Sequence, residues 1–126
     1  MTDEKAENCA ARVLDGAFKV HRELGPGLLE SVYETCLCIE LTKAGIHHIR
    51  QKRVPIFYDG IEIDAEFRLD LVVENCLVIE IKAVEILMQL HMAQLLTYLK
   101  ITGHHLGLLV NFNCALLKNG IRRVVL

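Results

Sequence analysis

The 126-residue sequence has little of what marks a membrane protein or a secreted protein. No apolar run approaches the roughly 18 residues that a transmembrane helix needs. The N-terminal stretch MTDEKAENCAARVLDGAF is charged and has no apolar segment like that of a signal peptide. These absences predict a cytoplasmic protein with no membrane partner.

The cysteines and histidines also lack the spacing of common metal sites. The sequence has five cysteines, an odd number, and no C-x-x-C. Cys36 and Cys38 are separated by one residue, which alone is a weak metal-binding signal. The histidine pairs at 47–48 and 104–105 show no zinc-ligand spacing. Free, mostly buried thiols in a reducing compartment are therefore the expected state.

The sequence also lacks a strong charge of either sign. A net charge of -2 argues against a protein that holds nucleic acid by bulk charge alone. The basic stretch at residues 50–53 could still contact phosphates, or it could be a solvated surface. With 52% hydrophobic residues, the composition is typical of a globular protein. The length predicts one domain, residues 1–126.

Apolar periodicity and turn signals predict the element order α-α-β-β-β-α-β-β. The expected elements are helices at about 6–24 and 28–44, strands at 54–58, 61–71 and 77–82, a helix at about 85–100, and strands at 106–112 and 121–126. Asp59-Gly60 is the strongest hairpin signal. The order predicts an α/β (α+β) fold, in which an antiparallel three-strand meander, a crossover helix and further strands form a mixed sheet with flanking helices.

Charged residues interrupt two apolar strands in LDLVVENCLVIEIKA, residues 69–83. With a turn at residues 74–76, Val72 pairs with Val78, and Asp70 lies opposite Glu80 on the face that also carries Lys82. Carboxylates that close repel each other unless a positive group offsets their charge. Lys82 is one such group, and Mg²⁺ or Mn²⁺ would be a second. The alternative is a solvated surface ion pair, and a one-residue register shift would separate these side chains.

This pattern resembles the P-D…(D/E)-x-K signature of the restriction-endonuclease-like nuclease superfamily, with Leu69 in place of the proline. The stretch GLLESVY, residues 27–33, resembles the G-x-x-E-x-x-Y motif that names the GxxExxY family within it. HMAQLLTYLKITG and GLLVNFN resemble the closing helix and strand of that family. The resemblance covers about residues 11–125 and implies a restriction-endonuclease-like mixed sheet.

The resemblance also implies the roles of a metal-dependent nuclease. Asp70, Glu80 and the backbone carbonyl of Ile81 would bind Mg²⁺ or Mn²⁺, and Glu30 would add a ligand from an early helix. For Glu30 the alternative is a favourable charge in the first helical turn. Lys82 would orient or deprotonate the attacking water, or stabilise charge on the phosphate.

Four further residues are expected to contact the substrate. Gln94 and Tyr98 are four residues apart on one helix and resemble the Gln-x-x-x-Tyr motif of RecB-like members. For Gln94, a hydrogen bond to the core backbone is the alternative. Tyr33 lies one turn after Glu30, with a core aromatic as its alternative. Arg68 could contact phosphate.

The predicted function is hydrolysis of DNA phosphodiester bonds in repair, recombination or defence. Two alternatives are a catalytically silent nuclease-fold module that binds nucleic acid or protein, and a metal-dependent enzyme with another substrate. A small chain offers little surface, so a symmetric homodimer would help it to span a duplex. The sequence leaves open the strandedness of the substrate, the number of metals and the pathway.

Overall fold

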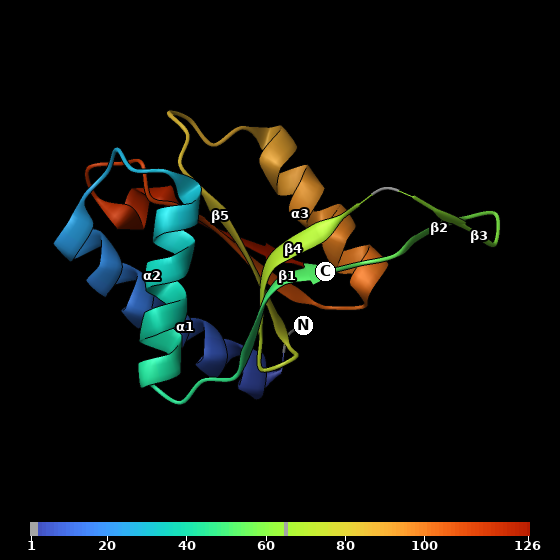
Figure 1. The fold of residues 1–126 in the computed structure, drawn as a ribbon, viewed down its shortest axis with the longest axis horizontal. Helices are drawn as coiled ribbons and strands as arrows, with labels where there is room; N and C mark the ends of the chain where they lie inside the picture. The colour runs from blue at the N-terminus through green and yellow to red at the C-terminus, as the bar shows by residue number, and fades with distance from the viewer. Residues whose placement is uncertain (1–2, 65) are drawn as a thin grey trace.

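The computed structural model describes residues 3–64 and 66–126 and contains a five-stranded mixed sheet flanked by helices (Figure 1). The elements are α1 (Glu4–Leu24), α2 (Glu30–Lys43), β1 (His48–Arg53), β2 (Ile56–Tyr58), β3 (Ile61–Ile63), β4 (Arg68–Val73), β5 (Leu77–Lys82), α3 (Gln89–Thr102), β6 (Leu106–Asn111), the 3₁₀ helix η1 (Leu117–Gly120) and β7 (Ile121–Val125). Among the described residues, none of the helices is long and apolar enough to cross a bilayer.

The main sheet has the strand order β1-β4-β5-β6-β7. β1, β4 and β5 form an antiparallel meander, and α3 carries the chain across to β6, which pairs with β5 in parallel. β7 adds the last strand, antiparallel to β6. The predicted fold class is therefore confirmed, because the meander, the crossover helix and the mixed sheet are all present.

Each face of the sheet packs against its own helices. α1 and α2 cover one face, where residues such as Val13, Tyr33 and Leu37 pack against Leu71 and Ile79 of the sheet. α3 covers the other face through two leucines at positions 95 and 99, which pack against apolar residues of β4, β5 and β6. The central strands are buried on both faces, as their nearly continuous apolar sequence predicts.

The first strand of the meander is not the one predicted. Residues 48–53 form β1 at the edge of the main sheet, whereas Val54–Tyr58 was expected in that place. The charged sequence HIRQKR has no alternating apolar pattern, because most of its side chains lie at the surface of an edge strand. The strand predicted at 61–71 is also divided into β3 and β4, with residue 65 outside the described residues.

The hairpin β2–β3 forms a small sheet of its own and projects from the body of the protein (Figure 1). Its turn is the predicted Asp59-Gly60, and both residues have the positive φ of such a turn, 53° and 76°. α3 begins at Gln89 instead of Glu85, and the Met88 backbone N–H donates to Nδ1 of His91 across its first turn. His91 thus has a structural role at the start of the helix.

Candidate active site

The charged residues of the hairpin lie where β4 and β5 separate. The two strands pair through Leu71 with Ile79, Val72 with Val78 and Val73 with Leu77. This register is the predicted one, so Asp70 and Glu80 are the next residues beyond the paired segment. Their opposition brings two carboxylates to one end of the hairpin.

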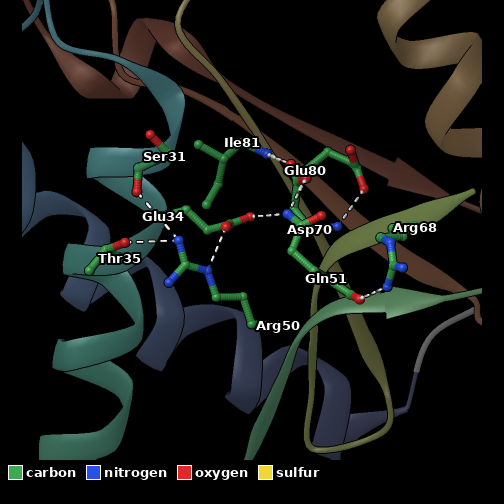
Figure 2. Close-up of polar contacts among 9 residues, drawn as sticks. All are labelled: Ser31, Glu34, Thr35, Arg50, Gln51, Arg68, Asp70, Glu80 and Ile81. Atoms are coloured by element: carbon green, nitrogen blue, oxygen red, sulfur yellow. Dashed lines mark hydrogen bonds and ion pairs between the residues drawn. The ribbon is translucent and has the colours of Figure 1, made fainter.

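The alternation of side chains in β4 breaks at Asp70. Leu71 packs in the core beneath α1 and α2, whereas Leu69 packs in the core beneath α3. Residues two apart in a regular strand share a face, so the chain turns over between these leucines. The prediction that Asp70 shares one face with Glu80 and Lys82 assumes a regular alternation, which β4 does not keep between these leucines. The Asp70 side chain contacts Gln51 of β1 and also interacts with the Glu80 side chain (Figure 2).

The carboxylate of Asp70 is held on both of its oxygens. Oδ2 accepts a hydrogen bond of 2.8 Å from the backbone N–H of Ile81, and Oδ1 accepts one of 3.3 Å from the side-chain amide of Gln51 (Figure 2). Burial raises the pKa of Asp70, and the charge of Glu34 raises it further. The hydrogen bonds and the charge of Lys82 act in the opposite direction. The surroundings of Asp70 thus only partly offset the cost of a negative charge on its carboxyl group.

Glu80 has a strongly raised pKa. Its side chain is buried, with 6% of the residue exposed, and Oε1 accepts a hydrogen bond of 3.3 Å from the backbone N–H of Asp70. Burial, followed by repulsion from Asp70, raises the pKa of Glu80 to about 8. Lys82 lowers the pKa of both carboxyl groups, so its ammonium lies within electrostatic range of each. The structure thus brings together Asp70, Glu80 and Lys82.

Asn111 fixes the chain that follows Lys82. It lies opposite Lys82 in the parallel ladder between β5 and β6, and it is buried. Its side-chain oxygen accepts from the Val84 N–H at 3.0 Å, and its amide donates to the Val84 carbonyl at 2.9 Å. Both backbone polar groups of Val84 are therefore held. The sequence analysis did not single out Asn111, since a polar residue at the end of a strand carries no distinctive signal.

An acidic pocket of about 200 Å³ lies between α2 and the two strands. Its lining is formed by residues of α2, β1, β4 and β5, namely Glu30, Ser31, Glu34, Gln51, Asp70 and Ile81. Glu30 is exposed at the start of α2, and it lines the same pocket as Asp70 and Ile81. Three residues with carboxylate side chains therefore line the pocket, and none of its lining residues is basic.

Glu34 is a residue that the sequence analysis missed. It is 5% exposed, and its Oε2 accepts a hydrogen bond of 2.6 Å from Nε of Arg50, while Oε1 accepts one of 2.8 Å from Gln51. Arg50 also donates to the hydroxyl of Thr35 at 2.8 Å. One signal was available, because Glu34 follows Glu30 by four residues and so shares its helix face.

The predicted substrate contacts lie in different environments. Tyr98 lies near the carboxylates, since burial and then the charges of Glu80 and Asp70 raise its pKa. Its ring packs on Phe67 at a centroid distance of 4.3 Å. Gln94 is half-buried one turn earlier on α3. Arg68 is exposed at the start of β4 and donates to the Gln51 carbonyl at 3.4 Å (Figure 2).

Tyr33 does not lie at this surface, and its prediction as a substrate contact is corrected. The residue has no exposed area, and its ring stacks on Phe112 at 4.6 Å between centroids. Its hydroxyl donates to the Gly25 carbonyl at 2.6 Å and accepts from the Leu28 N–H at 3.1 Å. A tyrosine so enclosed cannot touch a nucleic acid. It holds the turn between α1 and α2, and thereby the start of the helix that carries Glu30.

The oxygen donors around Asp70 suit a hard divalent cation in kind. Asp70 and Glu80 have raised pKa values because of burial and of a neighbouring negative charge, Glu34 for Asp70 and Asp70 for Glu80, and a nearby cation would offset both effects. Within residues 3–64 and 66–126, however, no three His, Cys, Asp or Glu side chains already stand together as around a metal ion. The carboxylates are bonded to backbone N–H groups and to Gln51. The carboxylate oxygens thus suit such a cation chemically, and in this structure they accept hydrogen bonds from protein groups.

The five cysteines offer no further site of this kind. All of them are free thiols, and only Cys9 is buried, while the other four are half-buried. Burial raises the pKa of Cys9 to about 12, so its thiol stays protonated at neutral pH. The chemistry-bearing side chains therefore concentrate at the end of β4 and β5.

Of three comparisons with known proteins, one gives a match. No curated protein and no solved structure matches the chain. A family comparison matches residues 7–124 to the PD-(D/E)XK nuclease superfamily. That range includes the Asp70 and Glu80-x-Lys82 of the separated strands, as well as α1, α2 and α3 in full or nearly so. The chain belongs to the PD-(D/E)XK nuclease superfamily.

Proposed function

We propose that the protein is a Mg²⁺- or Mn²⁺-dependent nuclease that hydrolyses phosphodiester bonds of DNA, in repair, recombination or defence. The observation that carries the proposal is the meeting of Asp70, Glu80 and Lys82 where β4 and β5 separate, beside a pocket that Glu30 also lines. The motif at residues 27–33 supports assignment to the GxxExxY family within the superfamily.

Each proposed residue has a defined task. Asp70, Glu80, the carbonyl of Ile81 and Glu30 would hold the cation. A bound divalent cation supplies a Lewis acid for the phosphate and lowers the pKa of water. The Lys82 ammonium stabilises charge that develops on the phosphate oxygens, or orients the attacking water. Asn111 restrains the backbone after Lys82 and so limits the positions that the ammonium can occupy.

The substrate would approach over the exposed side of this site. Arg68 beside Gln51 offers a guanidinium for phosphate, and Tyr98 and Gln94 border the carboxylates from α3. The chain has a net charge of -2 and no recognition helix in its predicted pattern, so we expect little sequence specificity. Phosphate contacts position a duplex without reading its bases.

Cleavage of labelled DNA tests the proposal. The panel holds single strands, duplexes, flaps and four-way junctions, each with Mg²⁺, Mn²⁺ or EDTA. We expect metal-dependent cutting that Lys82→Ala lowers by about a hundredfold or more, as for other losses of a transition-state charge partner. Lys100→Ala, an exposed lysine of α3, is the matched control and should cut as the wild type does. Unchanged cutting by Lys82→Ala would refute the assignment.

One observation favours a second function. The Asp70 carboxylate accepts hydrogen bonds from a backbone N–H and from the Gln51 amide, and the described residues contain no ready-made group of three metal-ligating side chains. This arrangement also suits a catalytically silent nuclease fold that binds nucleic acid or protein. If the protein binds a four-way junction or a duplex but cleaves neither in the presence of Mg²⁺ or Mn²⁺, the binding module is supported.

A homodimer remains part of the proposal. The projecting hairpin β2–β3 exposes the apolar residues Phe57, Tyr58, Ile61 and Ile63, and a second copy could cover them. Sedimentation over micromolar concentrations decides this point, since a monomer throughout the range would remove the dimer from the proposal.

A further inference from the structure

Gln51 stands between two carboxylates of the acidic pocket. Its side-chain amide donates to Oε1 of Glu34 at 2.8 Å and to Oδ1 of Asp70 at 3.3 Å (Figure 2). One amide nitrogen therefore joins α2 to β4. It is a neutral group that lies between the Glu34 and Asp70 carboxylates and bonds to both.

The backbone at Gln51 is unusual for a strand. Its φ is 52°, in the left-handed region that residues other than glycine, asparagine and aspartate rarely adopt. The ladder between β1 and β4 pairs Arg50 with Leu71 and Lys52 with Leu69, so Gln51 lies beside the point where β4 turns over. Such a conformation persists only where its surroundings enforce it, and it clusters at functional sites.

The remaining oxygens of the two carboxylates are already engaged. Oε2 of Glu34 accepts from Arg50 at 2.6 Å, and Oδ2 of Asp70 accepts from the Ile81 N–H at 2.8 Å. The other two oxygens, Oε1 of Glu34 and Oδ1 of Asp70, are the ones that the Gln51 amide holds. A cation entering the pocket would need at least the Asp70 oxygen, so it would compete directly with the amide of Gln51.

We propose that Gln51 is a positioning residue that keeps the metal-free site closed and sets its affinity for a divalent cation. The inference rests on the proposed function, because it assigns a competitor for the same cation. The amide spaces Glu34 and Asp70 while no cation is bound, and it must release Asp70 when one binds. The structure thus assigns a role in metal loading to a residue of the edge strand β1.

The test is a titration of EDTA-treated protein with Mn²⁺. Binding is measured by calorimetry and by the electron paramagnetic resonance signal of free Mn²⁺. Gln51→Asn keeps a residue that tolerates the left-handed backbone but shortens the amide by one methylene group. We expect Mn²⁺ to bind about tenfold more tightly, the effect of one lost hydrogen bond to a charged group. The metal-free variant should also unfold at a lower urea concentration.

Two further variants keep the inference falsifiable. Gln51→Glu places a third carboxylate beside the other two, so it should also bind Mn²⁺ more tightly and lower the stability of the metal-free protein. Thr35→Ala removes a hydrogen bond of the same network, the one from Arg50, and should leave Mn²⁺ affinity unchanged. Circular dichroism confirms that each variant is folded.

The outcomes separate this inference from the proposed function. If the wild type binds Mn²⁺ and both Gln51 variants bind it equally or more weakly, the closing role is refuted, while the nuclease proposal stands. Weaker binding by Gln51→Asn would identify the Gln51 oxygen as a cation ligand instead. If neither the wild type nor any variant binds Mn²⁺, and Asp70→Asn behaves in the same way, the metal-dependent function and the inference both fall.

Discussion

Replacement of Glu80 by Gln is expected to stabilise the metal-free protein at mildly alkaline pH, although it removes a proposed metal ligand. The Glu80 carboxyl group is buried, and burial together with repulsion from Asp70 raises its pKa from 4.5 to about 8. Above its ordinary pKa the unfolded chain carries the charge freely, whereas the folded chain must bury it. The contribution of Glu80 to stability is therefore fully present below about pH 4.5 and is lost as the pH rises through about 8.

The size of the effect follows from the same two values. The pKa of Glu80 rises from its ordinary value of 4.5 to about 8, which means that the folded state disfavours the charged form of this group. Between about pH 5 and about pH 8, this group alone lowers the free energy of unfolding by about 3 kcal/mol. An amide at position 80 has no charge to bury, and its oxygen can still accept the hydrogen bond from the Asp70 N–H. Asp70 keeps part of the pH dependence in the variant, because burial raises its pKa as well.

Urea unfolding in EDTA, followed by circular dichroism at a series of pH values, measures this effect. The wild type should lose stability toward alkaline pH, and Glu80→Gln should lose much less. Glu23→Gln, an exposed residue of α1, is the control and should change stability by less than about 0.5 kcal/mol. A wild type whose stability is flat over this range, or a Glu80→Gln variant no more stable than it at the alkaline end, would refute the reasoning.

Two further predictions concern the supports of the site. Tyr33→Phe should lower stability by about 1–2 kcal/mol, because its hydroxyl serves both Gly25 and Leu28, while affinity for DNA should not change in a filter-binding assay. A loss of DNA affinity at unchanged stability would contradict its core role. Gly120→Ala should destabilise by about 1–3 kcal/mol in urea, since a Cβ atom there would meet the Asn111 carbonyl. A variant as stable as the wild type would show that the backbone at Asn111 yields easily.

The central hairpin could be predicted from the sequence because two independent signals agree. A three-residue turn predicted the register, and apolar residues on both sides of β5 identified a central strand. The pairing of Val72 with Val78 follows from both signals. The charges within this apolar run then indicated a site, because buried charges in a central strand are rare without a purpose.

Other features left no pattern to detect. β1 is an edge strand with mostly exposed side chains, so its sequence lacks the alternating apolar pattern of a half-buried strand. Two of its residues, Arg50 and Gln51, nevertheless donate hydrogen bonds to Glu34. Glu34 reads as one more surface glutamate of a helix, and only its distance of four residues from Glu30 suggests otherwise. The turning over of β4 at Asp70 depends on Leu69 and Leu71 entering different cores, which is a property of the tertiary packing.

Three departures from local rules coincide at the end of β4 and β5. Gln51 adopts a left-handed backbone within a strand, β4 turns over at Asp70, and the Glu80 carboxyl group is buried against another carboxyl group. The strained backbone and the buried carboxyl group lower the stability of the metal-free fold, and consistent folds show such conflicts mainly at functional sites. A module that bound its partner through surface charge alone would need none of them. Their meeting at one place therefore favours chemistry at the separated strands over a purely binding role.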